Sequence, residues 1–293
     1  MRLVSEPTPL VDALADPKRR GAETAIRQPE DTIVYVEGGL DRAFFRKHTS
    51  APNLTFMNIG KNKGKHEILS TVSITEDSYG IVDMDHDFDS SEITSSRLVD
   101  TSKQCCLYGF VTQGEGNEEM IELAIATVHS VCRDLQDDPR INLNRSQMVE
   151  QLTYGGDRFG NFVSERTKAR LYRGHLGSTR ETRAPAEGEC NWSDVVSSNG
   201  NPVRDRITDS MSQGYELFKQ EYSEQISDAG INEHDICDAI ILLFKDQYAG
   251  YQDREVLVMS QVEFHVGRLM IRKGNYDMTN YFLGELGLID GEE

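Results

Sequence analysis

The residues best suited to chemistry are four aspartates in the first third of the chain. They follow the segment 79–82, which has the composition of a buried β-strand, and occupy alternate positions: Asp83, Asp85, Asp87 and Asp89. In an open parallel sheet, ligands bind at the carboxyl ends of the strands, so this acidic string lies where a site is expected. Carboxylates this close together repel one another unless protons or a hard cation such as Mg²⁺ intervene. The pattern therefore indicates a metal site at a strand end.

A second acidic residue follows another predicted strand. Glu37 comes directly after residues 32–36, a β-branched and aromatic run, and two glycines follow it and permit close approach of the backbone. If the two strands are neighbours, Glu37 and Asp83 lie at the same edge of the sheet. Such a pair suits metal-dependent phosphoryl transfer, in which aspartates hold the ion and a glutamate moves a proton or helps to hold a second ion.

These carboxylates have other possible interpretations. A calcium-binding EF-hand loop is excluded, because it needs glycine at its sixth position and an acidic residue at its twelfth, where this sequence has Phe88 and Thr94. A solvated acidic turn stays open for the string, and a cap or an exposed residue for Glu37. Aspartates alternating after a strand also serve nucleotidyl and glycosyl transferases, although the Glu37-Gly38 pair on the first strand counts against that function.

Taken together, these motifs resemble a known fold family. The segment VEGGLDRAFF (residues 36–45), then a strand and Gly60-Lys61, then GIVDMD (residues 80–85) are similar in order and spacing to the Toprim fold. The likeness is greatest to a group of Toprim-like proteins with a VEG-x-x-D-x-x-FF signature. That group is related to the overcoming-lysogenization-defect (OLD) nucleases and is found beside an ATPase in phage-defence systems. The resemblance covers residues 31 to about 125, and nothing after residue 137 matches.

The resemblance implies a nuclease that hydrolyses phosphodiester bonds of DNA or RNA with Mg²⁺ or Mn²⁺. It implies Glu37 as general acid–base and Asp83 and Asp85 as metal ligands, with Asp87 assisting. A further glutamate is expected at the start of a later helix, where Glu119 matches better than its neighbours Glu118 and Glu122. An ATPase partner is also implied, and a homo-oligomer stays open. The alternative is a Toprim-like module that binds or regulates without turnover.

Basic residues add two expectations. Three of the chain's ten lysines, Lys61, Lys63 and Lys65, fall within five positions on a loop expected at the carboxyl edge of the sheet. They do not form a P-loop, because only three residues separate the glycines and Lys-His follows. Contact with substrate phosphate is the functional interpretation, and a solvated loop is the alternative.

The second basic group lies between residues 158 and 206, which carry nine basic and six acidic residues. Arg166, Lys168, Arg170 and Arg173, with Tyr172 among them, could line a groove that contacts a nucleic-acid backbone. A salt-bridged helix face is at least as good an explanation.

The elements that must position these residues alternate between strand and helix. Strands are predicted at 32–36, 54–59, 79–82 and 104–111, and helices at 40–48, 66–72 and 117–135. This order predicts an α/β fold with a mainly parallel, Toprim-like sheet flanked by helices. We expect a lead-in segment at 1–30, the α/β domain at 31–136 and a mostly helical region at 137–293. That last region includes a helical insertion, a long loop at about 174–206 and a helical C-terminal part.

Composition limits the class of protein. The 293 residues include 31 Lys and Arg and 49 Asp and Glu, so the formal net charge is 31 − 49 = −18. This charge argues against general nucleic-acid binding, although few lysines and many acids are also typical of a salt-rich cytoplasm. The stretch 76–138 alone has 15 acidic and three basic residues, a balance of −12 around the predicted metal site. Five cysteines without a CxxC pair, no signal peptide and no long apolar stretch predict a cytoplasmic protein without a membrane partner.

Overall fold

The structure is a computed structural model that describes residues 32–59, 65–83, 95–100, 117–136, 143–175, 192–196, 209–228, 231–248 and 250–289. These residues group into two units. The sheet unit contains the described residues up to 82, residues 95–100 and those from 270 onward. The helical unit contains residue 83 and the described residues from 117 to 269. No helix in the described parts of the chain is both long and apolar enough to cross a membrane.

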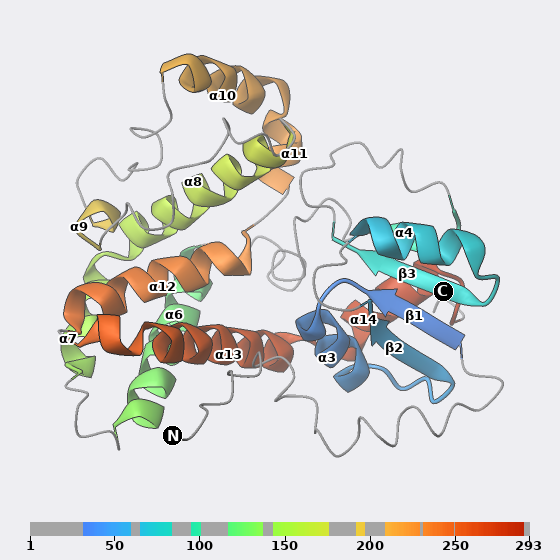
Figure 1. The fold of residues 1–293 in the computed structure, drawn as a ribbon, viewed down its shortest axis with the longest axis horizontal. Helices are drawn as coiled ribbons and strands as arrows, with labels where there is room; N and C mark the ends of the chain where they lie inside the picture. The colour runs from blue at the N-terminus through green and yellow to red at the C-terminus, as the bar shows by residue number, and fades with distance from the viewer. Residues whose placement is uncertain are drawn as a thin grey trace, which may run out of the picture. The chain divides into compact units, whose positions relative to one another are not determined.

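In the described residues, the sheet unit is built on four parallel strands in the order β2-β1-β3-β4, of which Figure 1 labels β1, β2 and β3. Their bounds are β1 Thr32–Val36, β2 Leu54–Asn58, β3 Ser78–Val82 and β4 Leu98–Asp100. In register, Val36 lies beside Asn58 of β2 on one side and beside Ile81 of β3 on the other. The two central strands therefore end side by side at the same edge of the sheet.

One face of the sheet is covered by α4 (Lys65–Ile74). Ile68 and Val72 of this helix are fully buried and form a core cluster with Val82 and Leu98. A Cβ built at Gly80 would lie 2.6 Å from side-chain atoms of both Ile68 and Leu98. Because real Cβ atoms do not approach so closely, glycine at this position lets α4 pack directly onto β3.

The opposite face is covered by α3 (Gly39–Lys47) and α14 (Tyr276–Glu285). Phe45 of α3 stacks on Phe56 of β2 with ring centroids 5.5 Å apart, and its edge meets Phe282 of α14, also at 5.5 Å. Phe44 is fully buried and packs against Gly274, just before α14. The apolar side of α3 is thus enclosed by residues 274–285.

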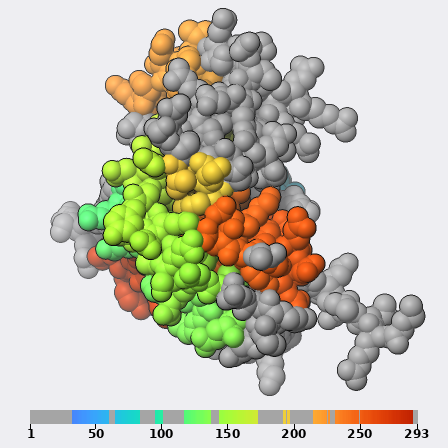
Figure 2. Space-filling view, turned by 90° about the vertical axis from the view of Figure 1, so that its left-hand side faces the viewer, coloured from blue at the N-terminus to red at the C-terminus, as the bar shows by residue number. Residues whose placement is uncertain are grey.

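The described residues of the helical unit form eight helical elements and most of a ninth. They are α6 Asn117–Leu135, α7 Arg145–Tyr154, α8 Gly156–His175, α9 Trp192–Val195, α10 Asp209–Glu221, α11 Ser223–Asp228, α12 Glu233–Gln247, a 3₁₀ turn at Tyr251–Arg254 and α13 Glu255–Lys273. The last turn of α13 belongs to the sheet unit. Figure 2 shows the short α9 lying between α8 and α12 on one face of this unit. There Trp192 is buried, with its ring 6.5 Å from that of Phe159.

The expected α/β class with a parallel sheet flanked by helices is confirmed. Three predicted strands appear within one or two residues of their expected bounds, whereas β4 was not anticipated. The strand expected at 104–111, the lead-in segment 1–30 and most of the loop at 174–206 lie outside the described residues. The two units also divide the chain differently from the expected boundary near residue 136, because α6 groups with the helices and residues 270–289 group with the sheet.

Candidate functional site

The two acidic residues central to the sequence prediction both follow strands of the sheet. Glu37 comes directly after β1, Asp83 comes directly after β3, and both residues are partly buried. Because β1 and β3 are hydrogen-bonded neighbours in parallel, the two residues leave the sheet at the same edge. The adjacency of the two parallel strands is the one expected from the sequence.

The turn after Glu37 is fixed by a local hydrogen bond. Gly38 precedes the first residue of α3, and its backbone N–H donates to Asp41 Oδ2 at 2.7 Å. A Cβ at Gly38 would lie 2.9 Å from the same oxygen, so the bond requires glycine or a shift of the aspartate. Asp41 thus closes the start of the helix and holds the chain in place immediately after Glu37.

A third carboxylate at this edge was not anticipated. Asp100 is the last residue of β4 and is in register with Val82, the last residue of β3. Three consecutive strands of the sheet, β1, β3 and β4, therefore carry an acidic residue at or directly after their carboxyl ends. The sequence signal was weak, because the described part of β4 has only three residues and Asp100 looks like an ordinary loop aspartate.

Lys65 is the only one of the three predicted phosphate-contacting lysines within the described residues. It is the first residue of α4, and only 8% of its surface is exposed. Lys65 interacts with a neighbouring group, and α4 begins where the chain returns from the carboxyl edge of the sheet.

Four predicted site residues lie outside the described residues: Asp85, Asp87, Lys61 and Lys63. Glu119 is in the first turn of α6, in the helical unit, and its Oε2 is buried. Across the described ranges, no three His, Cys, Asp or Glu side chains come together in a way that could hold an ion. The expected metal site depends on Asp85, so it stays a prediction.

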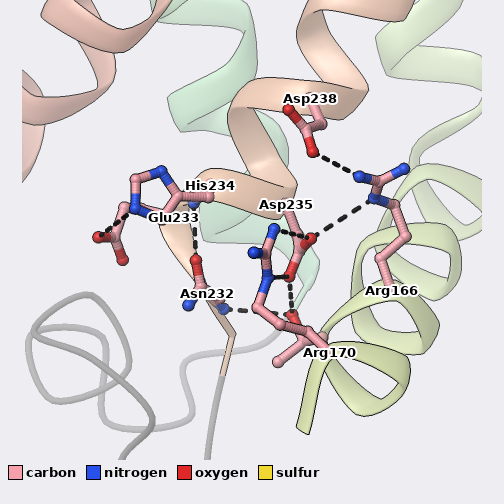
Figure 3. Close-up of polar contacts among 8 residues, drawn as sticks. Arg166, Arg170, Asn232, Glu233, His234, Asp235 and Asp238 are labelled. Atoms are coloured by element: carbon pink, nitrogen blue, oxygen red, sulfur yellow. Dashed lines mark hydrogen bonds and ion pairs between the residues drawn. The ribbon is translucent and has the colours of Figure 1, made fainter. Parts of the chain in front are cut away.

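The helical unit contains a separate polar cluster, drawn in Figure 3. Asp235 of α12 is almost completely buried and is held by the guanidinium of Arg170, with bonds of 2.9 and 3.2 Å, and by Thr167 Oγ1 at 3.0 Å. Arg166 donates to Asp235 at 3.5 Å and also pairs with Asp238. Both arginines extend from α8 toward α12 (Figure 3).

The sequence also allowed a groove for nucleic acid lined by these basic side chains of α8, and their contacts test that interpretation. Arg166 and Arg170 are engaged with Asp235, Lys168 pairs with Glu165 at 3.0 Å, and the ring of Tyr172 is buried against Tyr215. The observed contacts are those of a salt-bridged helix face. Arg166 and Arg170 join α8 to α12, whereas Lys168 pairs within α8 and Tyr172 packs against α10. The side chain of Arg173 lies outside the described residues.

In the described part of the helical unit two thiols are buried, and neither is suited to act as a nucleophile. Burial raises the pKa of Cys132 to about 11, against a smaller lowering by Arg145. Burial also raises the pKa of Cys237 well above its usual value, and nearby carboxylates, Glu233 first among them, raise it further. Because the thiolate is the reactive form, both side chains act as packing groups.

Comparison with models of known protein families, with curated proteins and with solved structures finds no match to this chain.

Proposed function

We propose that the chain is a Toprim-like, metal-dependent nuclease that hydrolyses phosphodiester bonds of DNA or RNA. The observation that carries the proposal is the placement of Glu37 and Asp83 directly after two neighbouring parallel strands. Asp100 at the end of the next strand adds a third carboxylate to the same edge. The order of motifs in residues 36–85 supports the family, and the acidity of the surrounding sequence suits a site that binds cations.

Each residue has a role that follows from its chemistry. Asp83, with Asp85 and Asp87, supplies the oxygen ligands that Mg²⁺ or Mn²⁺ prefers, and Glu119 is a candidate for a further ligand. When bound, the ion supplies charge neutralisation at the phosphate and lowers the pKa of a coordinated water. Glu37, held on the turn that Asp41 fixes, takes the proton from the attacking water and returns one to the leaving oxygen.

Lys65 favours binding of the substrate phosphate. An ammonium at the start of α4 brings positive charge to the edge that carries the carboxylates, and Lys61 and Lys63 precede it in the chain. The cation offsets repulsion between a phosphodiester and this acidic site. The family resemblance also supports a cytoplasmic effector controlled by an ATPase partner.

The first test is cleavage of labelled single-stranded DNA, duplex DNA and RNA in the presence of Mg²⁺ or Mn²⁺. We expect metal-dependent cleavage that falls by about 100-fold or more in Glu37→Gln and Asp83→Asn, since a positioned acid–base group contributes about 10²–10⁴. Removal of the metal with EDTA should abolish cleavage. Matched controls are Glu76→Gln and Asp77→Asn, which change exposed carboxylates directly before β3, at the opposite edge of the sheet.

Unchanged cleavage in Glu37→Gln, or equal losses in the control variants, would contradict the assignment of the site. No turnover with any metal on any of the three substrates would instead support the binding module. In that case the purified chain should still associate stably with a partner protein.

A further inference from the structure

Two basic segments that are far apart in the sequence lie against each other in the sheet unit. Lys47 Nζ, in the last turn of α3, donates to the carbonyl oxygen of Ile271 at 3.1 Å. The next residue, His48, donates from Nε2 to the same carbonyl oxygen at 2.7 Å. The last turn of α3 is thus fixed beside the last turn of α13, although the two are separated by 224 residues.

The joined segments carry an excess of positive charge. Residues 39–48 and 270–277 contain five cations and two carboxylates, Asp41 and Asp277, a balance of 5 − 2 = +3 in a chain of net charge −18. Asp41 is already occupied by the N–H of Gly38. Within the described residues, neither Lys47 nor Arg272 forms an ion pair with a carboxylate. We call this the basic surface, and its cations are Arg42, Arg46, Lys47, Arg272 and Lys273.

An aromatic ring is exposed beside these cations. Tyr276 begins α14, is 53% exposed, and its ring centroid lies 6.1 Å from that of His48. The ring lies nearly perpendicular to that of His48, and about half of the residue is exposed to solvent. Cations that contact a phosphate backbone, combined with an aromatic ring on which a base can stack, are the usual components of a site for single-stranded nucleic acid.

The course of α3 connects this surface to the candidate site. The helix begins two residues after Glu37, at the carboxyl edge of the sheet, and its cations follow at Arg42 and one turn later at Arg46, about 6 Å further along the axis. Lys47, and Arg272 next to the residue that Lys47 contacts, extend this row of cations away from the carboxyl edge of the sheet. A strand whose phosphates follow these cations would therefore lead toward Glu37.

We propose that the basic surface binds the backbone of a single-stranded nucleic-acid substrate, with Tyr276 stacking on a base; this rests on the proposed nuclease function. Electrostatics favours this binding position. A polyanion is repelled by most of a chain with a charge of −18, so a local cluster of cations determines where it can approach.

Cations in the last turn of a helix also stabilise it through the helix dipole, so binding must be measured separately from stability. The experiment uses the full chain with Glu37→Gln and EDTA, so that no cleavage interferes. Binding of a labelled single-stranded oligonucleotide is followed by fluorescence anisotropy over a range of salt concentrations. The test variant is Arg272→Gln/Lys273→Gln. The control is Arg133→Gln/Lys245→Gln, which removes two exposed cations from the last turns of α6 and α12.

We expect the test variant to bind roughly tenfold more weakly, and the slope of log affinity against log salt to fall by about 1.4, as for two lost phosphate contacts to a single strand. Tyr276→Ala should weaken binding without changing that slope. The control should bind like the parent protein, and melting temperatures should verify that every variant is folded.

The proposal is overturned if the test and control variants bind equally well. It is also overturned if polyglutamate binds as tightly as the oligonucleotide, which would indicate an acidic protein partner. Because binding is measured without metal, its failure is distinguishable from failure of the nuclease proposal, which is judged by cleavage alone.

Discussion

His265 is almost completely buried in the helical unit, where its ring Nε2 lies 2.8 Å from Asp134 Oδ2. The acceptor is a carboxylate, so the ring nitrogen is the donor. Burial is the largest influence and lowers the pKa of His265, and the positive charges of Arg133 and Arg268 lower it further. The hydrogen bond to Asp134 and the charge of that carboxylate raise the pKa, but by less. Burial raises the pKa of Asp134, but hydrogen bonds from His265 and Arg133 outweigh that effect and bring the pKa below its usual value.

A pH dependence of stability follows. The folded state keeps His265 neutral at a pH where the unfolded chain, with a histidine pKa near 6.5, already takes up a proton. Stability from this residue is therefore present above about pH 6.5 and is lost as the pH falls below it. Replacing His265 with Gln keeps an N–H donor for Asp134 and removes the titration.

The measurement is the melting temperature at about pH 7.5 and about pH 5.5. We expect His265→Gln to show a smaller decrease on acidification than the parent protein. His129→Gln, at an exposed histidine on α6, is the matched control and should behave like the parent. An unchanged decrease in His265→Gln would contradict the assignment.

The roles of individual residues were predictable only where the local sequence decides them. Glu37 and Asp83 follow apolar runs and lie at strand ends as expected. Arg166 and Arg170 gave no such signal, because their partner Asp235 is 65 or more residues away and only the packing of α8 against α12 brings it near.

At the scale of elements, the packing of α4 on β3 depends on the absence of a side chain at Gly80. Its neighbours in register, Tyr35 and Leu98, lie on the same face of the sheet and pack in the same cluster. Ile68 and Val72, in the middle of α4, therefore pack directly over β3 at Gly80.

We expect Gly80→Ala to destabilise the protein by about 1–3 kcal/mol, because the added methyl group must displace Ile68 or Leu98 in a filled core. Gly284→Ala is the matched control: a Cβ there meets nothing within 4 Å, and alanine should stabilise α14 by about 0.5–1 kcal/mol. Urea unfolding of both variants provides the free energies. Equal stability of Gly80→Ala and the parent would show that α4 is not in close contact with β3.

Strands β1, β2 and β3 were predictable because each is a β-branched or aromatic run bounded by turn residues. The described β4 has three residues, too few for a periodic signal, and it exists because the edge of β3 offers hydrogen bonds. Helix α6 was predictable from apolar residues at three- and four-residue spacing, and α12 and α13 lie in the region that was predicted to be mostly helical.

For the molecule as a whole, the sheet unit is discontinuous in sequence. Among the described residues, its strands end at Asp100, and the helix α14, which also belongs to it, begins at Tyr276. A domain boundary near residue 136 was the natural expectation, because the family-like motifs stop before it. No local signal in α14 indicates that Phe282 packs on Phe45, since this pairing is a property of the tertiary structure.

Phe282→Ala should therefore destabilise the sheet unit, by about 3–5 kcal/mol, since the ring is fully buried against Phe45. Tyr281→Ala, at the exposed neighbouring position of α14, should cost less than about 1 kcal/mol. The nuclease assay provides a second measurement, because loss of the packing beneath α3 should lower activity in the first variant. Equal stability of the two variants would contradict the assignment of α14 to the sheet unit.

Because the sheet unit is discontinuous in sequence, its parts leave the ribosome at different times during synthesis. Translation at about 5–20 residues per second places a delay of roughly 9–35 s between Asp100 and Tyr276. Throughout this interval Phe44 and Phe45 lack the cover that α14 provides, and the nascent chain presents an aromatic surface that chaperones can bind. The sheet unit, and with it the packing that supports the turn after Glu37, is completed only when α14 has emerged from the ribosome.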